Sequence, residues 1–114
     1  MKIIAISDTH GFLPESIPEA DVFVHAGDFC SRGSVAEAIR FNEWLGTLPH
    51  KRKIVIAGNH DWAMLDYSHL ITNAVYLQDS GVIIDGIKFW GSPWQPRFFD
   101  WAFNLDRGAE LKSK

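Results

Sequence analysis

Three short apolar runs, each followed within two residues by Asp, His, Asn or Gly, constrain most strongly how this chain can fold. The runs are Lys2–Ile6, Val22–Val24 (extending to Asp21–His25) and Lys53–Ala57. Their length and β-branched content are typical of buried parallel strands. After the second run, Ser34 with Glu37 forms a capping-box pattern that predicts a helix start, and apolar residues at helical spacing continue to Gly46. This β-α-β order predicts an α/β fold with a mainly parallel sheet.

The remainder of the chain predicts shorter elements. Asp85-Gly86 lies between two apolar runs and is a strong signal of a two-residue hairpin turn. The expected elements are a helical turn at Ile17–Ala20, one or two helical turns within Trp62–Leu70, a strand at Ala74–Leu77, a C-terminal hairpin over Val82–Trp90, a rigid loop at Gly91–Pro96 and a helix beginning near Asp106.

Size, charge and cysteine content narrow the class of protein. The 114 residues are enough for one domain, which we expect to span residues 1–114. A net charge of −3 without a basic block makes nucleic acid an unfavourable partner. Cys30 is the single cysteine, which excludes an internal disulfide; it is interpreted as a small residue, with a ligand role as the alternative. The first apolar run is too short for a membrane helix or signal peptide, so a cytoplasmic location without a membrane partner is expected.

Polar side chains follow each of the three predicted strands. Because the carboxyl ends of parallel strands meet at the same edge of a sheet, these side chains should converge in one crevice. Asp8 and His10 are two residues apart and can face one cation, whereas Asp28 can bridge two cations and Asn59 offers a neutral oxygen to a second. Such oxygen and nitrogen donors suit divalent Mn, Fe, Zn or Mg ions.

The third cluster also carries candidate acid-base chemistry. His60 is interpreted as a catalytic acid that protonates a leaving oxygen or binds a phosphoryl oxygen. Asp61 is expected to hold that imidazole and keep it protonated. Each cluster also has a structural interpretation, in which Asp8 and Asp28 stabilise turns, His10 lies at the surface and Asp61 serves a helix N-terminus.

The three clusters, in this order, resemble the first signature blocks of the calcineurin-like metallophosphoesterases. The matching blocks are Asp8-Thr9-His10, Gly27-Asp28 and Gly58-Asn59-His60-Asp61; the stretches Gly91–Pro96 and Asp100–Leu105 resemble the branch of small metallophosphoesterase-domain proteins. The resemblance implies an α-β-β-α sandwich and hydrolysis of phosphomonoesters or phosphodiesters, cyclic nucleotides included, by metal-activated water. It also implies two divalent metal ions: Asp8 and His10 at the first, Asp28 between both, and Asn59 at the second.

One departure from the family pattern limits this expectation. The family's second half supplies a further histidine and a Gly-His-x-His block, whereas this sequence has only His69 after His60. The resemblance is therefore to the N-terminal half of the sandwich, a partial domain that is expected to be inactive alone if the C-terminal metal-binding histidines are required. One hypothesis is a half-enzyme that a complementary C-terminal half completes.

A second hypothesis is a non-catalytic binding module. Seven of the 15 aromatic residues fall within one short stretch near the C-terminus: Phe89, Trp90, Trp94, Phe98, Phe99, Trp101 and Phe103. Exposed aromatic surface of this kind marks partner contacts, although ordinary core is the alternative. Base stacking on these rings is disfavoured because no basic groove accompanies them. Bare sheet edges also favour pairing into a homo-oligomer.

Overall fold

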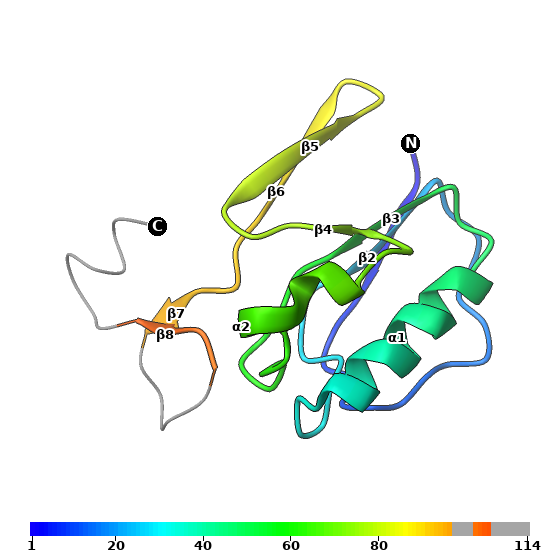
Figure 1. Ribbon diagram of the computed structural model, residues 1–114. Helices are drawn as coiled ribbons and strands as arrows, with labels where there is room; N and C mark the ends of the chain where they lie inside the picture. The colour runs from blue at the N-terminus through cyan, green and yellow to red at the C-terminus, as the bar shows by residue number, and fades with distance from the viewer. Residues whose placement is uncertain (97–101, 106–114) are drawn as a thin grey trace.

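The computed structural model describes residues 1–96 and 102–105, and its centre is a four-stranded parallel sheet (Figure 1). The sheet order is β1-β2-β3-β4, which is also the order of these strands in the chain. Their bounds are β1 Ile3–Ile6, β2 Val22–His25, β3 Arg52–Val55 and β4 Val75–Tyr76. The helices are α1 Val35–Thr47, α2 Met64–Tyr67 and the 3-10 turn η1 Ser68–Leu70. All four strands therefore end at the same edge of the sheet.

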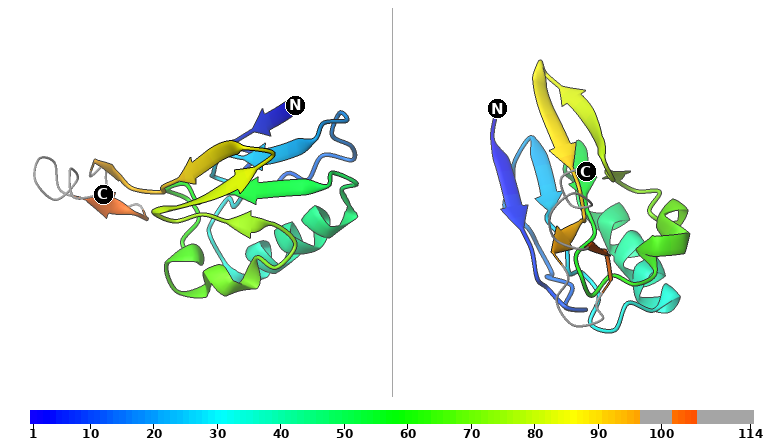
Figure 2. Two further views of the ribbon diagram at one scale, coloured as in Figure 1. Left: turned by 90° about the horizontal axis from the view of Figure 1, so that it is seen from above. Right: turned by 90° about the vertical axis from the view of Figure 1, so that its left-hand side faces the viewer.

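The remaining strands form two small pairs. β5 (Ser80–Ile84) and β6 (Ile87–Gly91) make an antiparallel hairpin around Asp85-Gly86. β7 (Gln95–Pro96) pairs in parallel with β8 (Asn104–Leu105). Figure 2 shows the arrowheads of β1, β2 and β3 pointing toward the end of the molecule at which β7 and β8 lie. The C-terminal segment thus reaches the edge of the sheet where the candidate site is expected.

Successive residues along the strands of the sheet belong to two separate apolar clusters, one on each face. On one face Phe23 of β2 belongs to the cluster that contains Phe41 and Leu45 of α1. On the other face its neighbour Val22 belongs to the cluster that contains Ile84 of the hairpin. This alternation is the period of two that a strand imposes. The helices therefore cover one face of the sheet and the hairpin covers the other.

The hairpin covers its face of the sheet only in part and presents an apolar face of its own to solvent. Ile3 on the edge strand β1 is 45% exposed. Ile83 and Trp90 on the outer side of the hairpin are 69% and 58% exposed, and the Lys88 ammonium lies 5.7 Å from the centre of the Trp90 ring. We call Ile83, Lys88 and Trp90 the outer hairpin face.

The predicted α/β class, with a mainly parallel sheet and a C-terminal hairpin, is confirmed. The helical turn expected at Ile17–Ala20 is wrong, because the chain there is irregular and the Pro18 carbonyl accepts a hydrogen bond from His50 Nε2 at 2.8 Å. The loop expected at Gly91–Pro96 is also partly wrong, because its last two residues form β7. The helix expected from Asp106 lies outside the described residues.

The start of α1 combines the expected cap with an unexpected partner. Ser34 is the N-cap and its hydroxyl accepts from the Glu37 backbone N–H at 3.2 Å, as predicted. The Glu37 carboxylate, however, accepts from the backbone N–H groups of Ser31, Arg32 and Gly33, at 2.8 to 3.1 Å. Burial alone would raise the pKa of Glu37, but these donors lower it to about 2. Glu37 thus ties the loop after β2 to the helix.

This contact predicts an acid-sensitive share of stability. The folded pKa of Glu37 lies below its ordinary value of 4.5, so its contribution is present above about pH 4.5 and is lost as the pH falls toward 2. Glu37→Gln is expected to lower the free energy of unfolding by about 1–2 kcal/mol at pH 7, a range reduced for partial solvation. In urea titrations the difference in free energy of unfolding between Glu37→Gln and wild type should narrow below pH 4.5. Glu43→Gln, at an exposed position on the same helix, is the control and should unfold with the same free energy as wild type.

Candidate metal centre

Backbone hydrogen bonds join the loops that follow β1 and β2 beyond the ends of the strands. The N–H of Asp8 donates to the Gly27 carbonyl, that of His10 to the Asp28 carbonyl, and that of Gly11 to the Phe29 carbonyl, each at 2.9 Å. We call these three bonds the loop ladder. It lies beyond the parallel pairing of β1 with β2, which ends at Ile6 and His25. Three main-chain bonds therefore fix the position of the first polar cluster relative to the second.

Four of the candidate side chains converge on this edge. Nε2 of His10 lies 3.8 Å from Oδ1 of Asp8 and 4.0 Å from Oδ2 of Asp28. His10, Asp28 and His60 each offer one donor atom, and these three atoms all lie within 4.8 Å of one another. The His10 and His60 rings meet edge to face with centres 5.0 Å apart. Separations of this size fit a shared divalent cation, and they include His60, which the sequence analysis assigned to acid catalysis.

Asn59 contributes an acceptor that lacks a partner. Its Oδ1 is one of two buried side-chain atoms without a hydrogen bond among the residues that the structure describes. A buried carbonyl oxygen without a donor costs free energy unless a cation or another group satisfies it. The backbone carbonyl of Asn59 accepts from the N–H of Ala102 at 3.0 Å. The side chain thus has the chemistry of a cation ligand beside His60.

Asp61 is placed differently from the other candidates. It is completely buried, and its Oδ2 accepts from the backbone N–H of Asp28 at 2.8 Å and of Gly58 at 2.7 Å, while Oδ1 accepts from that of Cys30 at 2.8 Å. Burial raises the pKa of Asp61 to about 6, and the three donors oppose this rise. The carboxylate therefore joins the second cluster to the third from below. Its expected contact with the His60 imidazole stays a prediction.

Three candidate ligands have left-handed backbone conformations. The φ angles of Asp8, His10 and Asp28 are 56°, 45° and 58°. Such conformations cost a non-glycine residue about 1–3 kcal/mol and concentrate at functional sites. The alternative interpretation, in which Asp8 and Asp28 only stabilise turns, does not explain why their carboxylates also converge with imidazoles.

Two glycines permit the close approach of the clusters. A Cβ on Gly58 would stand 2.2 Å from Oδ1 of Asp28, and a Cβ on Gly27 would stand 2.9 Å from the backbone nitrogen of Gly58. Gly27 also has a φ of 104°, which favours glycine. Oδ1 of Asp28 accepts from the His60 N–H at 2.9 Å. These glycines therefore set the distance between Asp28 and the third cluster.

The charge of the centre is set mainly by its carboxylates. A hydrogen bond from the Ser7 hydroxyl to Oδ2 of Asp8, 2.6 Å long, lowers the pKa of Asp8. Burial opposes this shift, while Asp28 and His10 add to it. Asp8 is consequently ionised at neutral pH, the form that binds a cation.

Two residues beneath the centre, Thr9 and His25, were not predicted from the sequence. Their side chains meet in the core, with Oγ1 of Thr9 2.9 Å from Nε2 of His25. The sequence feature that could have indicated His25 is its place at the end of an otherwise apolar run, directly before Ala26-Gly27. A titratable ring at a buried strand position needs hydrogen-bond partners.

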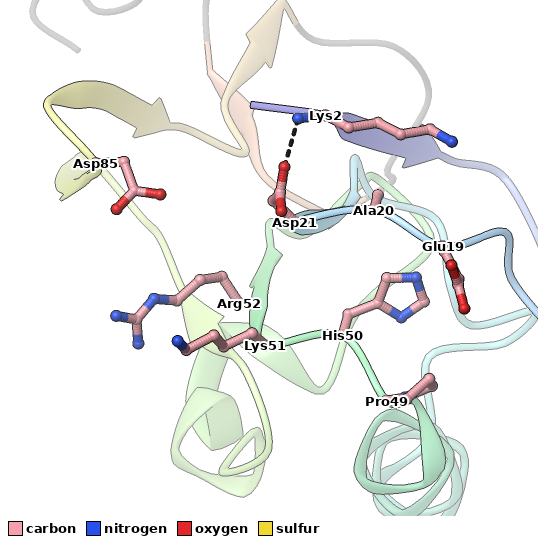
Figure 3. Close-up of a pocket in the computed structure, with 9 residues that line it drawn as sticks. All are labelled: Lys2, Glu19, Ala20, Asp21, Pro49, His50, Lys51, Arg52 and Asp85. Atoms are coloured by element: carbon pink, nitrogen blue, oxygen red, sulfur yellow. Dashed lines mark hydrogen bonds between the residues drawn. The ribbon is translucent and has the colours of Figure 1, made fainter.

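A cavity of about 640 Å³ lies away from this centre. It is found at the amino ends of the strands, beside Lys2, Asp21 and Arg52 (Figure 3). Its lining mixes basic with acidic side chains, and in Figure 3 those of Lys2 and Arg52 point in different directions. The donor atoms that suit a cation are at the carboxyl ends instead.

Comparison with known proteins gives consistent matches. Residues 1–106 match the sequence profile of calcineurin-like phosphoesterase. The chain is 41% identical to metallophosphoesterase domain-containing protein 1 of Homo sapiens, over 99% of this chain and 43% of that protein. It is 40% identical to UPF0046 protein K07C11.7 of Caenorhabditis elegans, over 84% of this chain and 40% of that protein. The chain thus spans less than half the length of these relatives.

Within residues 1–96 and 102–105, no helix has the length and apolar character needed to span a membrane.

Proposed function

This chain belongs to the calcineurin-like phosphoesterase family, and from that premise we propose that it hydrolyses phosphate esters at the centre formed by Asp8, His10, Asp28, Asn59 and His60. The observation that carries the proposal is the convergence of carboxylate and imidazole donors within 4.8 Å. The unpartnered Oδ1 of Asn59 supports a second cation position. We propose small phosphomonoesters or phosphodiesters as substrates, with cyclic nucleotides as the first class to test, and a cytoplasmic location.

Each residue has a separate task in this proposal. Asp8 and His10 would hold one divalent cation, Asp28 would be shared with a second, and Asn59 would serve that second cation. When bound, the two cations offset the charge of the phosphate and increase the acidity of a water molecule. Asp61 and the loop ladder hold these side chains in place before substrate binds. This division fits phosphoryl transfer, in which the protein mainly positions charges.

His60 acts on the substrate rather than only on the cations. Its ring packs edge to face on His10, and its backbone N–H holds Asp28, so the imidazole is anchored beside the carboxylates. In its protonated form it donates a hydrogen bond to a phosphoryl oxygen or a proton to the leaving oxygen. A His60→Ala variant distinguishes these two steps. A defect in substrate binding indicates the hydrogen bond to the phosphoryl oxygen, whereas a defect in rate indicates the proton transfer.

The proposal is tested by Mn²⁺-dependent release of nitrophenolate from bis-(p-nitrophenyl) phosphate and from p-nitrophenyl phosphate. Wild type should release nitrophenolate, and Asp28→Asn should lower the rate by more than about 100-fold, beyond the range for outer partners of a metal ligand. Asp66→Asn, an exposed carboxylate on α2, is the matched control and should retain the wild-type rate. Equal rates for wild type and Asp28→Asn would refute the assignment of the centre.

A second candidate is a half-enzyme or interaction module that needs a complementary chain or a second copy. The exposed outer hairpin face favours it. In the same assay, activity that appears only after addition of a C-terminal segment of the human relative would support the half-enzyme. A chain that binds Mn²⁺, stays monomeric and gains nothing from the added segment would exclude it.

A further inference from the structure

His25 is a polar residue in an apolar part of the core. It ends β2 and is completely buried. Its ring meets the rings of Phe29 and Phe41 edge to face, with centres 5.9 and 5.2 Å apart. Packing of this kind would suit phenylalanine as well, so the two nitrogens need a separate explanation. Buried nitrogens remain in a core at low cost only when both are hydrogen-bonded.

Both nitrogens of His25 have partners, and these partners fix the tautomer. The backbone N–H of Gly27 donates to Nδ1 at 3.2 Å, so Nδ1 carries no proton. Nε2 therefore carries the proton of the neutral ring, and it donates to Oγ1 of Thr9 at 2.9 Å. Burial lowers the pKa of His25 to about 4. The neutral ring with its proton on Nε2 is thus the form present at neutral pH.

The two partners belong to the two loops that carry the first three candidate ligands. Thr9 lies between Asp8 and His10, and its side chain reaches into the core while the donor atoms of its neighbours lie 3.8 Å apart at the surface. Gly27 precedes Asp28. One ring therefore bonds to both loops from below, at the point where their backbones adopt left-handed conformations.

We propose that His25 is a positioning residue of the metal centre, which acts through the Thr9 hydroxyl and the Gly27 N–H to hold Asp8, His10 and Asp28 at cation-binding separation. The proposal rests on the proposed function, because it assumes that these residues bind a cation. His25 itself touches neither cation nor substrate. The loop ladder sets the register of the two loops, whereas the ring sets how deeply the Asp8-Thr9-His10 loop sits on the core.

The test is Mn²⁺ affinity of the purified chain, measured from the electron paramagnetic resonance signal of free Mn²⁺. Thr9→Val keeps the shape of the side chain but removes its hydroxyl, and should weaken Mn²⁺ binding by about 10- to 100-fold, the range for outer partners of metal ligands. Thr9→Ser restores the hydroxyl and should restore affinity. Thr47→Val, whose hydroxyl bonds only to its own helix in α1, is the matched control and should leave affinity unchanged.

A double variant identifies His25 as the partner through which Thr9 acts. His25→Phe keeps the ring packing and removes both nitrogens; combined with Thr9→Val it should bind Mn²⁺ no more weakly than His25→Phe alone. The visible spectrum of bound Co²⁺ should change in both single variants, which a purely structural role would not cause.

The outcomes separate this proposal from the function on which it rests. No Mn²⁺ binding by wild type would overturn both. Binding by wild type with equal affinity for Thr9→Val, or additive losses in the double variant, would overturn the positioning role alone. If Thr9→Val does not fold, Thr9→Ala removes the same hydroxyl with less bulk and gives the same comparison with Thr9→Ser.

Discussion

Gly58→Ala is expected to weaken Mn²⁺ binding by more than about 100-fold while the chain still folds. The added Cβ would stand 2.2 Å from Oδ1 and 2.5 Å from the backbone nitrogen of Asp28. Because both distances are too short for non-bonded atoms, we expect the Asp28 carboxylate to move away from His10 and His60. In the proposed centre Asp28 is shared by both cations, so its displacement should cost more affinity than the loss of an outer partner. The steric cost to folding is smaller, about 1–3 kcal/mol.

The matched control is Gly86→Ala at the tip of the hairpin. Gly86 has a φ of 80° and no neighbouring atom within 4 Å of an added Cβ, so alanine there strains the backbone without moving a ligand. Calorimetric Mn²⁺ titration and thermal unfolding of both variants separate the two effects. Similar Mn²⁺ affinity in Gly58→Ala and wild type would show that Asp28 does not bind the cation.

Asp61→Ala is expected to cause the largest loss of stability, about 3–6 kcal/mol. It leaves the N–H groups of Asp28, Cys30 and Gly58 without an acceptor, and each buried donor left unpaired costs about 1–3 kcal/mol. The total free energy of unfolding of a small domain is about 5–15 kcal/mol, so this loss is a large share of it. The thermal midpoint should fall by at least about 12 °C. Thermal unfolding at pH 8, where the carboxylate is ionised, measures the change.

Two further variants keep this prediction decisive. Asp61→Asn retains one acceptor oxygen for the N–H groups of Asp28 and Gly58 and should lose less stability than Asp61→Ala, while its amide group opposes the Cys30 N–H. Asp66→Ala, an exposed carboxylate on α2, should shift the midpoint little. A midpoint for Asp61→Ala close to that of Asp66→Ala would show that the three backbone bonds contribute nothing to folding.

The sheet could be predicted from sequence because its first three strands are short apolar runs, each followed closely by polar residues or glycine. Phe23 and Val22 feed opposite clusters, as the period of two requires. The turn expected at Ile17–Ala20 failed because Pro18 lacks an N–H and its carbonyl bonds to His50, 32 residues later. The pairing of Gln95–Pro96 with Asn104–Leu105 left no pattern, since strands of two residues show no alternation.

The convergence of the candidate ligands was also predictable, since it follows from parallel strands ending at one edge. The partners of Asp61 were not, because they are backbone N–H groups up to 33 residues away, and any residue except proline supplies one. The link from Thr9 to His25 was hidden for a related reason. Spacing indicated which residues of the first loop could share a face, but not what lies beneath the residue between them.

The loop ladder has a consequence for how this region can change over evolutionary time. Its bonds join Asp8 to Gly27, His10 to Asp28 and Gly11 to Phe29, with Thr9 passed over between the first two. Inserting or deleting a single residue on either side would shift these bonds and change the position of Asp8 and His10 relative to Asp28. Substitutions here can be gradual, whereas changes of loop length cannot. Homologous sequences should therefore keep the same number of residues in each of these two segments, and should vary in residue type only at positions other than Asp8, His10 and Asp28.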